Sequence, residues 1–262
     1  MISVGVQNIG LVAQGINDWQ EATRLLRGEA DYAGGELPLL KPSMLKPNER
    51  RRTTRTIKIA LQAAEEALRD YSDSEGVLSV FSSSEGDLDI IDQICLALSQ
   101  EDRPVSPTQF HNSVHNAPAG YWSIGSGSHQ GSTSLGGLEG SFATGLMEAA
   151  VQCAMERRSV LMVSYDQPPP SLLEPFMPIS APFAVALLLT PESGGAISKL
   201  NLELTPNGEE SRMSEPVMEG LRSSAPAARS LPLLEMISKQ ATSKIVLPYL
   251  PGLKLHAETA PC

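Results

Sequence analysis

The sequence NAPAGYWSIGSGSHQGSTSLGGLEGSFATGLMEAA, residues 116–150, holds the clearest structural pattern in the chain. Its apolar spacing predicts a helix over residues 116–127, a short strand over 132–135 and a longer helix over 141–156. Glycine-rich turns separate these segments. An apolar strand over residues 160–164 is predicted directly after the second helix. Strands that alternate with helices in this way predict an α/β layer fold with a largely parallel sheet.

The segments on either side continue the alternation of strands and helices. One long helix is predicted over residues 48–71, where apolar residues recur at helical spacing. A proline-rich loop over residues 29–48 precedes it. Asn17 and Asp18 are expected to cap an earlier helix. The other predicted elements are strands over 2–12, 77–81, 182–190 and 197–204, and helices over 19–28 and 87–98.

The composition of the chain changes after residue 205. Residues 1–205 are expected to form one domain. Residues 206–230 are rich in Gly, Glu, Ser and Pro with few aliphatic residues, and we interpret them as a loop or linker. Residues 231–262 are interpreted as a short carboxyl-terminal extension, with a helix over 231–240 and a strand near 245–247.

Bulk composition excludes several classes of function. The 262 residues are 41% hydrophobic and 19% charged, which is typical of a globular protein. The net charge of −10 argues against binding to nucleic acid or to an anionic membrane. No apolar run approaches the roughly 18 residues of a membrane span, and no secretory signal is recognisable. Three scattered cysteines indicate a reducing compartment, so we expect a cytoplasmic protein without a cofactor.

The side chains most able to take part in catalysis or metal binding lie in and around residues 110–129, which contain three histidines and several serines. A nucleophile of the GxSxG type is absent, because the spacing around Ser126 and Ser128 does not fit. His111, His115 and His129 lack the neighbouring ligands of a zinc site, so we expect no metal. Histidines that form hydrogen bonds at a buried turn or an interface are the simpler interpretation.

The ordered set of motifs resembles the thiolase-fold ketoacyl synthases. Asn116-Ala117-Pro118-Ala119-Gly120 matches an N-x-x-A-G motif, which in that family leads through a helix and a strand to a cysteine at the start of a buried helix. The resemblance covers roughly residues 2–205. It implies a thiolase-like layered α/β fold that corresponds to the amino-terminal half only of a ketoacyl synthase. The family's cysteine lies nineteen residues after the glycine of the motif, and here that position is Glu139.

Two departures from this family argue against independent catalysis. A carboxylate at Glu139 cannot form the thioester that a condensing enzyme requires. Cys153 lies fourteen residues further along the chain and is expected to be a core residue. The family also uses two histidines from its carboxyl-terminal half, whereas only His256 follows residue 129 here.

A synthase without its cysteine is similar to a chain-length factor, and this sequence looks most like the small chain-length-factor-like proteins of aryl polyene clusters. The resemblance implies a heterodimer with a full-length ketoacyl synthase that acts on an acyl carrier protein. Phe110, His111 and His115 would reach the partner's acyl tunnel and set its depth. The expected interface and tunnel residues are Phe110, His111, His115, Asn116, Ser132, Thr133, Ser134 and Leu135.

The sequence also allows two interpretations of a basic cluster and two alternative functions. Arg50, Arg51, Arg52 and Arg55 could bind an acidic carrier protein, or they could form a solvated face that pairs with Glu49, Glu65 and Glu66. One alternative function is a free-standing acid–base enzyme, such as a malonyl decarboxylase, that uses Glu139 with a histidine. The other is a structural homodimer or scaffold.

Overall fold

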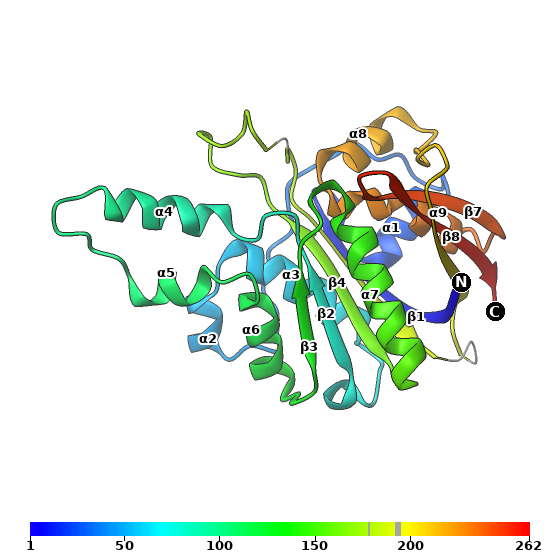
Figure 1. The fold of residues 1–262 in the computed structure, drawn as a ribbon, viewed down its shortest axis with the longest axis horizontal. Helices are drawn as coiled ribbons and strands as arrows, with labels where there is room; N and C mark the ends of the chain where they lie inside the picture. Colours follow the sequence, from blue (N-terminus) through cyan, green and yellow to red (C-terminus); the bar gives the residue numbers. More distant parts are fainter. Residues whose placement is uncertain (178, 192–194) are drawn as a thin grey trace.

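A single mixed sheet organises the protein. The structure is a computed structural model, which describes residues 1–177, 179–191 and 195–262. Within these residues eight strands form one sheet in the order β3-β2-β4-β5-β1-β6-β8-β7 (Figure 1). The strands are β1 (Ile2–Ala13), β2 (Leu78–Ser82), β3 (Ser132–Leu135), β4 (Val160–Asp166), β5 (Phe183–Thr190), β6 (Ser198–Thr205), β7 (Ser243–Leu250) and β8 (Leu253–Pro261).

Strand direction divides the sheet into two parts. β2 is parallel to both β3 and β4, whereas the pairings from β4 through β5, β1, β6 and β8 to β7 are antiparallel. The prediction of a largely parallel sheet is therefore wrong. Parallel neighbours need a long crossover, usually through a helix. The parallel strands β2, β3 and β4 have such helices between them, and β7 and β8 are joined by a tight turn at Gly252.

Helices cover both faces of the sheet (Figure 1). One core lies beneath α7 (Ser141–Glu156), together with α1 (Trp19–Leu26), α8 (Pro216–Ser224) and α9 (Leu231–Ser238). The other core lies beneath α3 (Arg55–Ala67) and α6 (Ala117–Ser126). Short helices complete the fold: α2 (Pro47–Arg52), α5 (Pro107–Asn112), and the 3-10 turns η1 (Ser74–Gly76), η2 (Leu138–Gly140) and η3 (Ala227–Ser230).

The long helix predicted over residues 48–71 is two helices, α2 and α3. Thr53 has an extended backbone with ψ of 148°, which ends α2. Thr54 then caps α3, because its side chain accepts the N–H of Ile57. A threonine that bonds to nearby backbone competes with a continuous helix, and apolar periodicity does not reveal such a break. The other expected helices and strands of residues 1–205 are present, and α5 is an additional helix.

The prediction of a loop over residues 206–230 is wrong for most of that segment. Helix α8 and turn η3 occupy it, and Glu215 caps α8 by accepting the N–H groups of Val217 and Met218. Several of its few aliphatic side chains, Met213, Met218 and Leu221, are buried in the core beneath α7. The hairpin β7–β8 continues the sheet beyond β6, so the carboxyl-terminal residues pack on the sheet.

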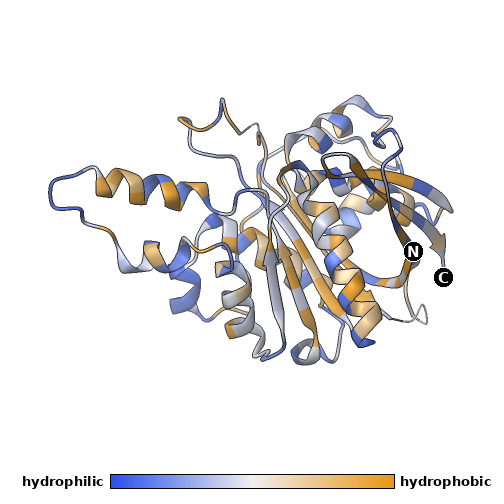
Figure 2. Ribbon diagram, in the orientation of Figure 1, coloured by the Kyte–Doolittle hydropathy of each residue, from blue (hydrophilic) through white to orange (hydrophobic). Residues whose placement is uncertain are grey.

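A helical arm projects from the body of the protein (Figure 1). It comprises α4 (Leu88–Leu98), a turn and α5, and is called the α4–α5 arm below. Apolar residues run along α4 (Figure 2), yet only Ile90 and Ala97 of this helix are buried. Among the described residues, no helix combines the length and the apolar character needed to cross a bilayer.

Candidate functional site

The turn between β3 and α7 contains the position where the family resemblance places a nucleophile. This turn, residues 136–140, is called the elbow below. Leu138 at its centre has φ of +49°, the left-handed region, which costs roughly 1–2 kcal/mol for a residue with a side chain. Its neighbour Gly137 has a negative φ of −158°. The strained residue of the elbow is therefore Leu138, and Glu139 follows it.

Hydrogen bonds and close packing fix the backbone of the elbow. The buried hydroxyl of Ser141 donates to the carbonyl of Leu138 at 2.6 Å and accepts the N–H of Gly137 at 3.1 Å. A Cβ on Gly140 would lie 1.9 Å from the carbonyl oxygen of Tyr249 on β7. The elbow is therefore held between the start of α7 and the carboxyl-terminal hairpin, and only glycine fits at residue 140.

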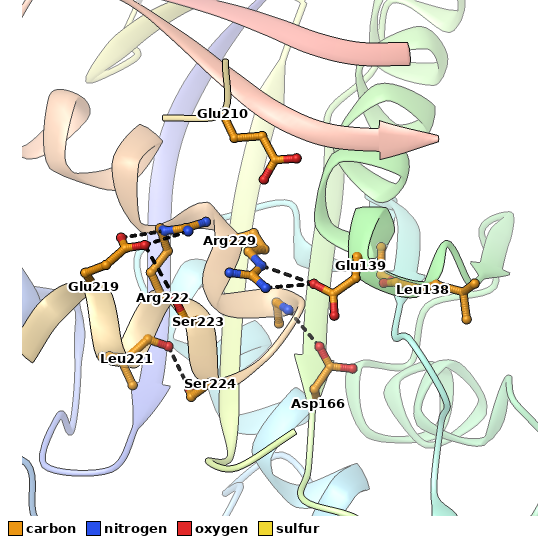
Figure 3. Close-up of polar contacts among 12 residues, drawn as sticks. Leu138, Glu139, Asp166, Glu210, Glu219, Leu221, Arg222, Ser223, Ser224 and Arg229 are labelled. Carbon is orange, nitrogen blue, oxygen red and sulfur yellow. Dashed lines mark hydrogen bonds and ion pairs between the residues drawn. The ribbon is translucent and has the colours of Figure 1, made fainter. Parts of the chain in front are cut away.

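Glu139 forms an ion pair with Arg229 of η3 (Figure 3). The Nη2 and Nε atoms of Arg229 lie 2.8 and 3.2 Å from the same carboxylate oxygen. The side chain of Glu139 is 58% exposed, while that of Arg229 is 18% exposed. Glu139 thus acts as a tether between the elbow and η3.

Asp166, at the end of β4, anchors η3 from the other side. Its buried carboxylate accepts the N–H of Ala227 at 2.7 Å and both the N–H and the hydroxyl of Ser84, at 2.9 and 2.8 Å. Burial raises the pKa of Asp166 to about 6, although these hydrogen bonds lower it in part. Neither Asp166 nor Arg229 is among the residues predicted from the sequence. An aspartate that closes an apolar strand was the available signal for Asp166.

His111 and His115 do not lie on one helix. Helix α5 ends at Asn112, and His115 lies in the turn that follows. His115 is half-buried, with Nε2 3.0 Å from the carbonyl of Leu135. His111 is exposed and packs edge-on against Tyr121. Within the described residues, no three His, Cys, Asp or Glu side chains are placed to bind a metal ion together.

The other predicted interface residues lie near the edge of the sheet. Phe110 is 68% exposed on α5, and Asn116 is exposed directly before α6. Ser132, Thr133, Ser134 and Leu135 form β3, which is the outermost strand and is paired with β2 on one side. His115 joins the turn after α5 to the end of β3. The structure thus brings these residues to one side of the protein.

The basic residues of α2 form few of the expected ion pairs. Arg52 lies 3.9 Å from Glu49, as predicted, whereas Arg50 donates to the carbonyl of Pro42. The expected pairing with Glu65 and Glu66 is wrong. Glu65 accepts the N–H groups of Ser43 and Met44, and Glu66 accepts those of Leu11 and Trp19. The carboxylates of Glu65 and Glu66 therefore accept backbone N–H groups instead of pairing with the arginines that lie near them in the sequence.

Comparison with known proteins agrees with this architecture. The family model described as β-ketoacyl synthase, N-terminal domain, matches residues 18–247. No protein with a curated description matches the chain by sequence.

Several solved structures share the fold. A chain of the complex of the ketosynthase ApeO with its chain length factor ApeC, from Xenorhabdus doucetiae, has a TM-score of 0.76 and 22% identity. The match covers 98% of this chain and 100% of that one. The ishigamide ketosynthase/chain length factor has a TM-score of 0.76 and 12% identity, covering 100% and 99%. A β-ketoacyl synthase from Burkholderia phymatum STM815 has a TM-score of 0.71 and 13% identity, and the match covers 100% of each chain. The expected thiolase-like fold is confirmed.

Proposed function

Because the chain belongs to the β-ketoacyl synthase N-terminal domain family, we propose that it is a chain-length-factor-like subunit without condensing activity of its own. In this proposal it pairs in the cytoplasm with a full-length ketoacyl synthase, as aryl polyene and type II polyketide systems do. The synthase supplies the chemistry and elongates acyl chains on an acyl carrier protein. This chain supplies a surface that limits the length of the product.

The composition of the elbow is the observation that carries the proposal. Condensation needs a thiolate to hold the acyl chain, and the elbow offers Leu138 and Glu139 instead. Glu139 is already paired with Arg229. Cys153 is fully buried in α7, where burial raises the pKa of its thiol to about 12. A thiol that stays protonated and lacks access to solvent is a poor nucleophile.

Exposed apolar residues beside β3 support a protein partner. Phe110, Val114 and Ile124 are each more than half exposed. Together with His111 and Tyr121 they line a groove of about 530 Å³ between α5 and α6. A large exposed apolar surface next to an unpaired edge strand is typical of an interface. In the proposal Phe110 and His111 reach the partner's acyl tunnel, and His115 positions the segment through its contact with Leu135.

The arginines of α2 and of the start of α3 support docking of a carrier protein. Helix α2 has no buried residue and carries Arg50, Arg51 and Arg52 in its last turn, and Arg55 begins the next helix. Such a local positive surface on a chain of net charge −10 suits an acidic carrier protein, through electrostatic steering.

Copurification with a synthase tests the proposed function. The chain is coexpressed with a full-length ketoacyl synthase encoded near its gene, and the complex is measured by size-exclusion chromatography with light scattering. We expect a one-to-one complex and acyl elongation by the pair. Elongation or malonyl decarboxylation by the isolated chain would overturn the proposal. A homodimer that binds no synthase would instead support the scaffold alternative.

A further inference from the structure

The elbow keeps a strained backbone although it holds no nucleophile. Three of its five residues are glycines, yet the residue in the left-handed region is Leu138. Glycine would adopt this conformation without penalty. Strain of this kind persists where the surrounding structure enforces it, and it often marks a functional position. Leu138 therefore has a backbone conformation that is unfavourable for leucine and that glycine would adopt without strain.

Burial within the chain does not compensate for this strain. The side chain of Leu138 is 66% exposed. Figure 3 shows that it points away from the ion pair, while Glu139 turns toward Arg229. The elbow cannot relax easily, because Ser141 and the packing of Gly140 on Tyr249 fix its backbone. The turn thus presents a rigid apolar side chain to the outside.

Arg229 is itself rigidly placed. Its turn, η3, is fixed by the hydrogen bond from Ala227 to the buried carboxylate of Asp166. The chain of contacts runs from the sheet through Asp166, η3 and Arg229 to Glu139, the neighbour of Leu138. Glu139 and Arg229 are therefore positioning residues for the elbow.

We propose that Leu138 is an anchor residue, inserted into an apolar pocket of the synthase subunit, and that the Glu139–Arg229 pair holds it in place. The inference rests on the proposed function and names the contact that the elbow makes in the complex. β3 leads directly into the elbow, and no strand of the described residues pairs with its outer edge, so a partner that covers this edge also meets Leu138. Residues that dominate binding cluster in well-packed pockets from which water is excluded, and an apolar side chain carried on a fixed backbone can fill such a pocket.

Substitutions at Leu138 separate this role from a purely structural one. Leu138→Gly removes the strain and the side chain together, Leu138→Ala removes most of the side chain, and Leu138→Met keeps an apolar side chain. Met155→Ala is the matched control, because Met155 is 78% exposed near the opposite end of α7. Affinity for the synthase is measured by titration calorimetry, and the Tm of each isolated chain by circular dichroism.

We expect Leu138→Gly and Leu138→Ala to weaken synthase binding by about tenfold or more. Leu138→Met and Met155→Ala should bind nearly as well as the wild type. The isolated Leu138→Gly chain should keep a Tm at or above that of the wild type, because its turn is no longer strained. An unchanged affinity of Leu138→Gly would overturn this inference alone. A wild-type chain that binds no synthase would overturn the proposed function and this inference with it.

Discussion

At the scale of single residues, two carboxylates, one half-buried and one buried, hold segments that are distant in the sequence. Glu66 on α3 accepts the N–H of Leu11 on β1 at 2.9 Å and the N–H of Trp19 on α1 at 2.6 Å. Burial raises the pKa of Glu66 to about 7. The same cause raises the pKa of Asp166 to about 6. Hydrogen bonds to Glu66 thus connect α3 with β1 and α1, and a hydrogen bond to Asp166 connects β4 with η3.

The raised pKa of Glu66 predicts a pH dependence of stability. The folded chain keeps a proton that the unfolded chain releases near pH 4.5, the ordinary value for glutamate. The free energy of unfolding should therefore decrease as pH rises from about 4.5 to 7, by at most about 3 kcal/mol from this group. Urea titrations across this range measure the effect.

The matched variants are Glu66→Gln and Glu65→Gln. Glu66→Gln should reduce the slope of the pH profile and leave the part that comes from Asp166, although it also loses part of the hydrogen bonding at this site. Glu65→Gln removes the neighbouring carboxylate, which also accepts backbone N–H groups. A profile with the same slope for Glu66→Gln and the wild type would contradict the assignment to Glu66.

At the scale of elements, the α4–α5 arm is poorly stabilised by the chain itself. Its outer apolar residues Ile91, Leu96 and Leu98 are exposed (Figure 2), and it projects from the sheet rather than packing on it (Figure 1). The apolar period of α4 predicts a helix correctly, because periodicity reflects local spacing. It does not tell whether the apolar face is covered by the same chain or by a partner.

Phe110, towards the carboxyl-terminal end of α5, should affect the length of the acyl chain that the pair produces. If its ring reaches the partner's acyl tunnel, Phe110→Ala deepens the tunnel and shifts products of the pair toward longer chains. Product length is measured by mass spectrometry of the chains released from the carrier protein. Leu39→Ala is the control, since Leu39 is also strongly exposed but lies in the loop before α2. An identical length distribution for Phe110→Ala and the control would argue against the tunnel contact.

At the scale of the whole molecule, the carboxyl-terminal residues complete the core. Leu221, Leu231 and Leu234 are buried in the core beneath α7, together with Leu247 and Leu255 of the hairpin. Strand β8 pairs with β6 along its full length. These contacts bind residues 206–262 to the sheet that residues 1–205 begin.

A fragment of residues 1–205 should therefore fail to fold independently. Removal of residues 206–262 would expose the apolar face of the sheet beneath α8 and α9 and leave β6 without its partner β8. It would also leave the buried carboxylate of Asp166 without the N–H of Ala227. We expect an insoluble fragment, or a soluble one without cooperative thermal unfolding. A fragment that unfolds cooperatively near the Tm of the full chain would contradict this prediction.

The sequence was sufficient for the positions of most helices and strands, for the family and for the absence of a cysteine at the elbow. Each of these follows from local spacing or from a short motif. Strand directions, helix α8 and the Glu139–Arg229 pair became visible only in the folded chain. Glu139 and Arg229 are 90 residues apart, and no periodic pattern records such a partnership. Long-range hydrogen bonds and ion pairs depend on how the elements pack, and that packing leaves the side chain of Leu138 exposed.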